Sequence, residues 1–187
     1  MKAYAVLIRG INVGGKNKVS MALLRTCLEK LGFTNVATYI ASGNVILTSD
    51  KKPAAIKQAI EAALIDNFTL DSKLIKVLVL DHKQLKTIIQ NRPKGFGDQP
   101  DTYHSDAIFL IDAPIDEAMP VFAPREGVDA VWPGTGVVYS QRLSEMRTKS
   151  RLGKIIGTPV YQSMTIRSWG TTVKLLKLLD ELEAAHS

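Results

Sequence analysis

The sequence predicts an α+β protein of two tandem ferredoxin-like βαββαβ units with antiparallel sheets, followed by a C-terminal helix. Short runs rich in Val and Ile alternate with longer segments whose apolar residues recur at helical spacing. The resulting order, β-α-β-β-α-β, is that of the split βαβ pattern, and it occurs twice along the 187 residues. The repeat is one of architecture and not of residue identity.

The first unit opens with a buried strand at residues 3–9, because a short apolar run suits a pleated interior. A glycine-rich loop follows. Ser20 then caps a helix that Gly32 ends.

A hairpin and a second helix complete the first unit. Residues 36–41 and 44–49 alternate around Ser42-Gly43-Asn44, a pattern typical of a hairpin. Pro53 opens the helix, since proline is favoured in the first helical turn. Residues 74–80 form the fourth strand.

The second unit repeats this order after a short helix, for which Asp81 and Gln84 form a capping box. Its expected elements are strands at 107–111, 129–132, 136–141 and 162–167, with helices from Pro114 and over 149–156. A final helix over 171–185 buries its leucines. These elements divide the chain into a first unit at 1–81, a helix and linker at 82–104, and a second unit at 105–187.

The composition is that of a globular protein. Apolar residues make up 45% of the chain, and no long uncharged apolar run predicts a membrane span. The apolar run at residues 3–8 is too short for a signal peptide. The single cysteine, Cys27, cannot form an internal disulfide and fits a reducing compartment, so a cytoplasmic location is expected.

The net charge of +6 is unevenly distributed. Residues 142–174 contain seven basic and one acidic residue, whereas residues 98–129 contain eight acidic and one basic residue. One interpretation is a face that attracts anions. The other is a solvated surface whose charges pair with the acidic stretch.

The topology predicts that the glycine-rich loop after the first strand faces the hairpin turn of the first unit. Glycines let backbone N–H groups approach a ligand, and a helix N-terminus follows the loop. The expected ligand-binding residues are Arg9, Asn12, Gly14, Gly15, Lys16, Ser42, Gly43 and Asn44. The loop is not a Walker A motif, because Asn17 stands where that motif has Ser or Thr. An ordinary wide turn beside a tight hairpin explains the same glycines.

In the second unit the third and fourth strands are expected to end at one edge of the sheet. Ser150 and Arg151, together with Arg167 and Trp169, would then lie at that edge. Arginine suits bidentate contact with phosphate or carboxylate, and tryptophan can stack on a ring. Ser150 could instead cap a helix, and Trp169 could belong to the core.

Four motifs identify a family resemblance that extends over essentially the whole chain. They are residues 7–15 (LIRGINVGG), 42–45 (SGNV), 150–152 (SRL) and 167–175 (RSWGTTVKL). Together they resemble the bacterial domain of unknown function 1697 family. That family usually has Asn on both sides of the tryptophan, where this chain has Ser168 and Gly170. The resemblance implies no activity. It does imply that these loops matter, and from it we expect the two units to bring them into one shared cleft.

No cofactor and no metal site are expected. The three histidines, His82, His104 and His186, are dispersed, with His104 assigned to a loop. Asp98, Asp101 and Asp106 are interpreted as an acidic solvated loop.

These observations favour a binding module for a phosphate-bearing ligand, a nucleotide or nucleic acid, held in a basic cleft formed by loops of both units. One alternative is an enzyme acting on a small phosphorylated or carboxylated substrate in the same cleft. Another is a protein that binds partners through exposed sheet edges. The sequence leaves the oligomeric state and any catalytic residue open.

Overall fold

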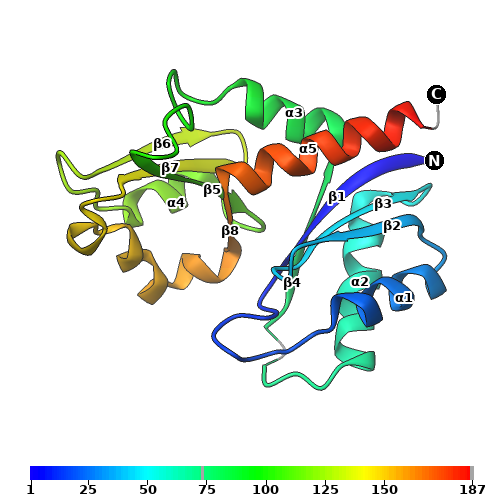
Figure 1. The fold of residues 1–187 in the computed structure, drawn as a ribbon. Helices are drawn as coiled ribbons and strands as arrows, with labels where there is room; N and C mark the ends of the chain where they lie inside the picture. The colour runs from blue at the N-terminus through cyan, green and yellow to red at the C-terminus, as the bar shows by residue number, and fades with distance from the viewer. Residues whose placement is uncertain (73, 186–187) are drawn as a thin grey trace. The chain divides into compact units, whose positions relative to one another are not determined.

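The computed structural model describes residues 1–72 and 74–185. It is an α+β protein with two four-stranded antiparallel sheets and a C-terminal helix (Figure 1). The chain divides into two compact units: unit 1 comprises Met1–Lys86 with Lys174–Ser187, and unit 2 comprises Thr87–Val173. The sequence-based division kept residues 105–187 together, whereas the structure groups the chain from Lys174 onward with unit 1.

Unit 1 contains one sheet with the strand order β2-β3-β1-β4. Its elements are β1 (Lys2–Arg9), α1 (Met21–Lys30), β2 (Thr34–Tyr39), β3 (Asn44–Ser49), α2 (Pro53–Asn67) and β4 (Lys76–Asp81). The expected order and the expected capping of α1 are confirmed, because the Ser20 side chain accepts the backbone N–H of Leu23. Gly32 follows the helix in the left-handed region with φ 84°, as a C-terminal glycine does.

The core of unit 1 is aliphatic and lies between the sheet and the two helices. Val6 and Ile8 of β1 pack there with Leu24 of α1 and Ile60 of α2. Alternate residues of β1 point to opposite faces, yet Ala5 and Leu7 on the other face are also fully buried. Sheet 1 is therefore covered on both faces.

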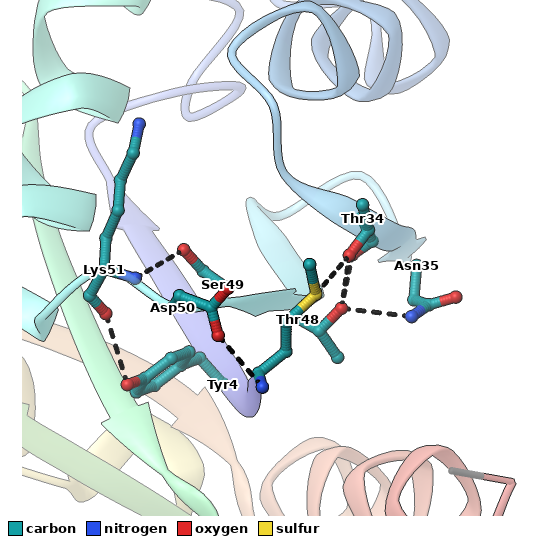
Figure 2. Close-up of polar contacts among 8 residues, drawn as sticks. Tyr4, Thr34, Asn35, Thr48, Ser49, Asp50 and Lys51 are labelled. Atoms are coloured by element: carbon teal, nitrogen blue, oxygen red, sulfur yellow. Dashed lines mark hydrogen bonds and ion pairs between the residues drawn. The ribbon is translucent and has the colours of Figure 1, made fainter.

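Polar contacts close one end of sheet 1, where β1 begins and β3 ends (Figure 2). The Tyr4 hydroxyl donates to the Lys51 carbonyl over 3.4 Å, and the hydroxyls of Thr34 and Thr48 lie 2.6 Å apart. The N-terminal ammonium group of Met1 pairs with Asp50 at 2.9 Å. The ligand-binding residues expected for unit 1 lie at the opposite end of the sheet.

Unit 2 contains a second sheet with the strand order β6-β7-β5-β8. Its strands are β5 (Tyr103–Leu110), β6 (Asp129–Gly134), β7 (Val137–Leu143) and β8 (Met164–Ser168). The connections are shorter than in unit 1: α4 (Ile115–Ala118) and the 3-10 segments η1 (Met119–Val121), η2 (Arg147–Lys149), η3 (Leu152–Gly157) and η4 (Pro159–Ser163). The α-helix expected over 149–156 is thus wrong in type. Gly153 and Gly157 weaken helix propensity there, and Pro159 stops the segment.

Two helices lie partly in each unit. Helix α3 (His82–Gln90) begins with the expected capping box, since the backbone N–H of Gln84 donates to Asp81 Oδ1 and Gln84 Oε1 accepts the backbone N–H of Asp81. Helix α5 (Trp169–Ala184) begins two residues earlier than expected and buries Leu175 and Leu179.

The two faces of sheet 2 have different cores. On one face Ile108 and Val138 pack against Leu152 and Ile155 of η3. On the other face four aromatic rings meet edge to face. The centroid of Phe96 lies 5.0 Å from that of Trp169, 5.4 Å from that of Tyr139 and 6.0 Å from that of Trp132. The Tyr139 hydroxyl donates to the Ile88 carbonyl at 2.6 Å.

No helix among the described residues is long and apolar enough to cross a membrane.

Candidate ligand-binding loops

Three loops of unit 1 meet at the end of the sheet where β1 finishes. The backbone N–H of Ile8 donates to the Gly43 carbonyl at 2.8 Å, which holds the hairpin turn against β1. The loop before β4 reaches the same place, because a Cβ added at Gly10 would lie 2.8 Å from the Leu74 carbonyl oxygen. The predicted juxtaposition of the glycine-rich loop with the hairpin turn is therefore present.

Asn12 fastens the glycine-rich loop to the hairpin. Its Nδ2 donates to the carbonyls of Val19 at 2.9 Å and Ala41 at 2.8 Å, while its Oδ1 accepts the backbone N–H of Val19 at 2.8 Å. Both donors and the acceptor are thus engaged with backbone. The sequence assigned Asn12 to a ligand; these contacts give it the task of positioning the loop.

Asn17 is the second residue that holds the glycine-rich loop in place. Its sequence position served above only to exclude a Walker A motif. The side chain is buried, donating through Nδ2 to the Gly10 carbonyl at 2.7 Å and accepting the backbone N–H of Ser72 at 3.0 Å. Its own backbone N–H donates to Asp71 Oδ2 at 2.6 Å. Asn17 also adopts φ 47°, a left-handed conformation that asparagine tolerates better than most residues. An asparagine in a glycine-rich loop is thus the sequence signal that could have identified Asn17 as a residue that shapes the loop.

The tip of the loop projects into open space. Gly14 and Gly15 have φ values of 58° and 76°, and the backbone N–H of Lys16 donates to the Val13 carbonyl at 3.0 Å, which closes a tight turn. A Cβ at either glycine would meet nothing within 4 Å. Val13 and Lys16 are both exposed at this tip.

Basic side chains lie on and beside the glycine-rich loop. Arg9 at the end of β1 lies directly opposite Lys76 of β4, and Lys16 and Lys18 are exposed on the loop. Residues directly opposite one another in an antiparallel pair point to the same face of the sheet, so Arg9 and Lys76 add positive charge to one face beside the loop. We call Arg9, Lys16, Lys18 and Lys76 the basic end of unit 1.

The hairpin residues have different exposures. Ser42 is exposed, Gly43 is buried and Asn44 has no exposed surface. Asn44 Nδ2 donates to the Tyr39 carbonyl at 3.1 Å and to Ser42 Oγ at 2.9 Å. A Cβ at Gly43 would lie 2.8 Å from the Ile8 carbonyl oxygen, so only glycine permits this close approach. Gly43 and Asn44 therefore shape the turn, and of the three expected ligand-binding residues of the hairpin Ser42 is the exposed one.

In unit 2, Ser150 and Arg151 lie beside the start of β6. The backbone N–H groups of Arg151 and Arg125 donate to Asp129 Oδ2 at 2.8 and 3.1 Å. Burial alone would raise the pKa of the Asp129 carboxyl, but these N–H groups, the Ser150 hydroxyl and the charge of Arg142 lower it below its ordinary value. Arg142 of the basic stretch thus lies near enough to Asp129 of the acidic stretch to lower its pKa, while the two charge interpretations stay predictions.

Arg167 lies inside unit 2. Its side chain is 7% exposed, and Nη1 donates to Thr165 Oγ1 and to the Ile166 carbonyl, both at 2.8 Å. Burial lowers the pKa of the guanidinium to about 10, so it stays charged at neutral pH. A guanidinium in this position supports the strand and does not face solvent.

Trp169 belongs to the aromatic core, as one of the two predicted alternatives expected. Gly97 makes room for its indole: Gly97 has φ 80°, and a Cβ there would overlap Trp169 Cδ1. Part of the indole also reaches the surface, where it lines a cavity.

That cavity has a volume of about 430 Å³ and lies where β5 begins and β8 passes into α5. Its lining includes Gly97, Tyr103, His104, Ser168, Trp169 and Gly170. Ser168 and Gly170, the two departures from the family pattern, both line it. Ser168 also accepts the backbone N–H of Thr171 at 3.2 Å and so caps α5.

His104 lies on strand β5 and not in a loop, and Nε2 lies 3.1 Å from Asp106 Oδ1. Burial raises the pKa of the Asp106 carboxyl, opposed by the nearby His104 and Arg142. The interpretation of Asp106 as part of a solvated loop is therefore wrong. The i, i+2 spacing of His104 and Asp106 on a strand was the available signal, because such residues share a face.

Within residues 1–72 and 74–185, no three His, Cys, Asp or Glu side chains gather so that they could hold a metal ion. His186 lies outside the described residues. The cleft shared by both units remains a prediction.

Comparison with known proteins agrees with the motifs. The model of a family described as protein of unknown function (DUF1697) matches residues 1–139. A solved structure of a conserved bacterial protein from Streptococcus pneumoniae is similar over 95% of this chain and 98% of its own, with 27% sequence identity and a TM-score of 0.78. No curated protein matches the chain.

Proposed function

Because the chain belongs to a family of proteins of unknown function, DUF1697, we propose its role from its own geometry: a binding module for a phosphate-bearing ligand, a nucleotide or a nucleic-acid segment. The ligand's phosphates are held at the basic end of unit 1. The observation that supports this most is the pairing of Arg9 directly opposite Lys76 beside the loop lysines.

The loop is held in place before any ligand arrives. Asn12 and Asn17 fix the glycine-rich loop through hydrogen bonds to backbone at both ends. A preorganised loop loses little conformational entropy on binding, which favours affinity. The exposed Gly14–Gly15 turn gives an anion close access to backbone, and Lys16 adds charge beside it.

Two narrower parts of the proposal concern the fold and the setting. Each unit is proposed to be a variant of the ferredoxin-like fold, supported by the equivalent strand orders β2-β3-β1-β4 and β6-β7-β5-β8. A cytoplasmic location is proposed from the single cysteine.

The test is fluorescence anisotropy of a labelled short single-stranded RNA, titrated at several salt concentrations. Affinity is expected to fall linearly with salt on logarithmic axes, because phosphate contacts release counterions. In a Lys16→Ala/Lys18→Ala variant the slope should decrease by about 1.4, since each lost phosphate contact on a single strand is worth about 0.7.

The matched control is Lys30→Ala/Lys83→Ala, which removes the same charge from exposed helix positions elsewhere. Its slope should remain that of the wild type. Equal slopes in both double variants would mean that only net charge matters and that the basic end is not the site.

A further inference from the structure

The cavity at the start of β5 lies within unit 2 and has no part in the proposed phosphate site. Its volume of about 430 Å³ falls in the range of small-molecule sites. Its walls combine the rings of Tyr103 and Trp169 with the polar side chains of His104 and Ser168. An apolar, aromatic wall with a few placed hydrogen-bonding groups is the usual make-up of a ligand site.

The lining argues for an uncharged ligand. None of the described residues that line the cavity is Lys, Arg, Asp or Glu. The wall therefore offers a charged ligand no lysine, arginine or carboxylate as a counter-ion, whereas an uncharged ligand needs none. The nearby Asp106 carboxylate, 3.1 Å from His104, further disfavours an anion.

The rings argue for a flat ligand. Trp169 is held in position by Phe96, whose centroid is 5.0 Å away, and by Tyr139 at 6.3 Å. Trp169 is 8% exposed, and the part of its fixed indole that reaches the cavity gives a heterocycle an apolar contact without ordering a mobile side chain. His104 and Ser168 supply donors and acceptors that match the edge of such a ring.

We propose that this cavity binds an uncharged aromatic heterocycle of nucleobase size, between the Trp169 and Tyr103 side of the wall and the polar groups of His104 and Ser168. The heterocycle is either a free nucleoside or a base presented by a nucleic-acid strand. This site extends beyond the proposed function and does not depend on it.

Gly170 offers a way to fill the cavity. It lies in the first turn of α5, lines the cavity, and would place a Cβ in open space. Leucine is also a better helix former than glycine, so Gly170→Leu should fold. The matched control is Gly153→Leu, because Gly153 is an exposed glycine of η3 whose Cβ would likewise meet nothing within 4 Å.

The readout is the fluorescence of Trp169 in a Trp132→Phe background, since the chain has two tryptophans. Adenosine, which has no phosphate, is expected to quench this signal saturably. Gly170→Leu should weaken that binding at least tenfold, and Gly153→Leu should leave it unchanged. His104→Ala, which alters a half-exposed side chain, should weaken it several-fold without unfolding the protein.

A second titration with a short single-stranded RNA separates the two sources. Quenching by adenosine that Gly170→Leu abolishes supports a free ligand. Quenching by RNA alone that Gly170→Leu abolishes supports a base presented by a strand. No quenching by either probe, or quenching that Gly170→Leu leaves intact, overturns the proposal. Lys16→Ala/Lys18→Ala should not alter adenosine binding, so failure of the phosphate site and failure of this one are distinguishable.

Discussion

Units 1 and 2 have the same strand order but opposite charges at corresponding ends. Where β1 finishes, unit 1 presents Arg9, Lys16 and Lys18, whereas unit 2 presents Asp112 and Glu117 after β5. The two acidic residues line a shallow cavity of about 400 Å³. Binding chemistry therefore belongs to the loops of each unit and does not follow from the shared topology.

The units also differ in how their cores are built. Unit 1 connects its strands with helices of 10 and 15 residues and packs aliphatic side chains beneath them. Unit 2 uses a four-residue helix and 3-10 segments, and one face of its sheet relies on a few large aromatic rings. Because this core depends on a small number of large side chains, we expect the stability of unit 2 to be more sensitive to a single core substitution than that of unit 1.

Gly97→Ala is the largest expected perturbation and would test that sensitivity. The new Cβ would overlap the Trp169 indole, whose ring cannot move freely because it is buried among other rings. Left-handed backbone strain and overpacking together should cost about 3 kcal/mol. Urea unfolding followed by tryptophan fluorescence measures this, because Trp132 and Trp169 both lie in unit 2.

Gly95→Ala is the control for that variant. Gly95 has the same φ of 80° but an open surrounding, so it shares the backbone strain without the overlap. If both variants lose the same stability, the indole is not held in place and unit 2 is less tightly packed than we argue.

Asn17→Ala is the corresponding test in unit 1. The change leaves the Gly10 carbonyl and the Ser72 N–H without this partner and places alanine at φ 47°. We expect a loss of about 2 kcal/mol, from unmade buried hydrogen bonds and left-handed strain. Far-UV circular dichroism in urea should record the loss.

Asn35→Ala is the comparison for that experiment, because Asn35 adopts a similar φ of 51° but is exposed. Its Nδ2 donates to the Thr48 hydroxyl at 3.0 Å, a bond that water can replace at this exposed position. Asn35→Ala should lose clearly less stability than Asn17→Ala. A similar loss of stability in the two variants would show that the hydrogen bonds of the Asn17 side chain stabilise the glycine-rich loop little.

The sequence predicted the order of the elements because apolar periodicity and caps are local signals. Ser20, Pro53 and the Asp81–Gln84 pair act within one helical turn, and all three are confirmed. The α-helix expected over 149–156 was wrong in type, because Gly153 lies inside that segment and Gly157 follows it, so that the chain forms short 3-10 turns between the strands.

Prediction of the site was weaker, since it depends on where each side chain points. Topology correctly brought the glycine-rich loop to the hairpin, yet Asn12 and Asn44 turn toward backbone and Arg167 toward the interior. Residue type alone cannot distinguish an amide that holds a loop from one that holds a ligand. The cavity beside His104 was not predicted, because Trp169 lies far along the chain from Gly97 and His104.

Asp106 and Asp129 give opposite pH dependences within unit 2. The pKa of Asp129 is lowered in the folded state, so its stabilisation is present above the ordinary aspartate pKa of about 3.9 and is lost as the pH falls below it. The pKa of Asp106 is raised, so the folded state loses stability as the pH rises from about 3.9 through the folded value.

Asp129→Asn should therefore destabilise unit 2 at pH 7 by about 1 kcal/mol, which is a charge-assisted hydrogen bond weakened by solvent screening, and have less effect in acid. In the wild type, ionisation of Asp106 destabilises the folded state above the ordinary aspartate pKa. Asp106→Asn should remove this effect, so that stability depends less on pH in that range. Tryptophan fluorescence melts across the pH range measure both. Parallel pH curves for the two variants would contradict the assigned environments.

Gly14→Ala should have the smallest effect on stability and a larger one on binding. Gly14 lies at φ 58° with nothing near its Cβ, so alanine adds only left-handed strain of about 1 kcal/mol, which far-UV circular dichroism in urea can measure. Because the methyl group stands on the exposed turn beside Lys16, it should hinder an anion approaching the backbone and weaken RNA binding several-fold. Weaker binding with nearly unchanged stability would locate the ligand at the basic end of unit 1, and unchanged binding would remove this turn from the site.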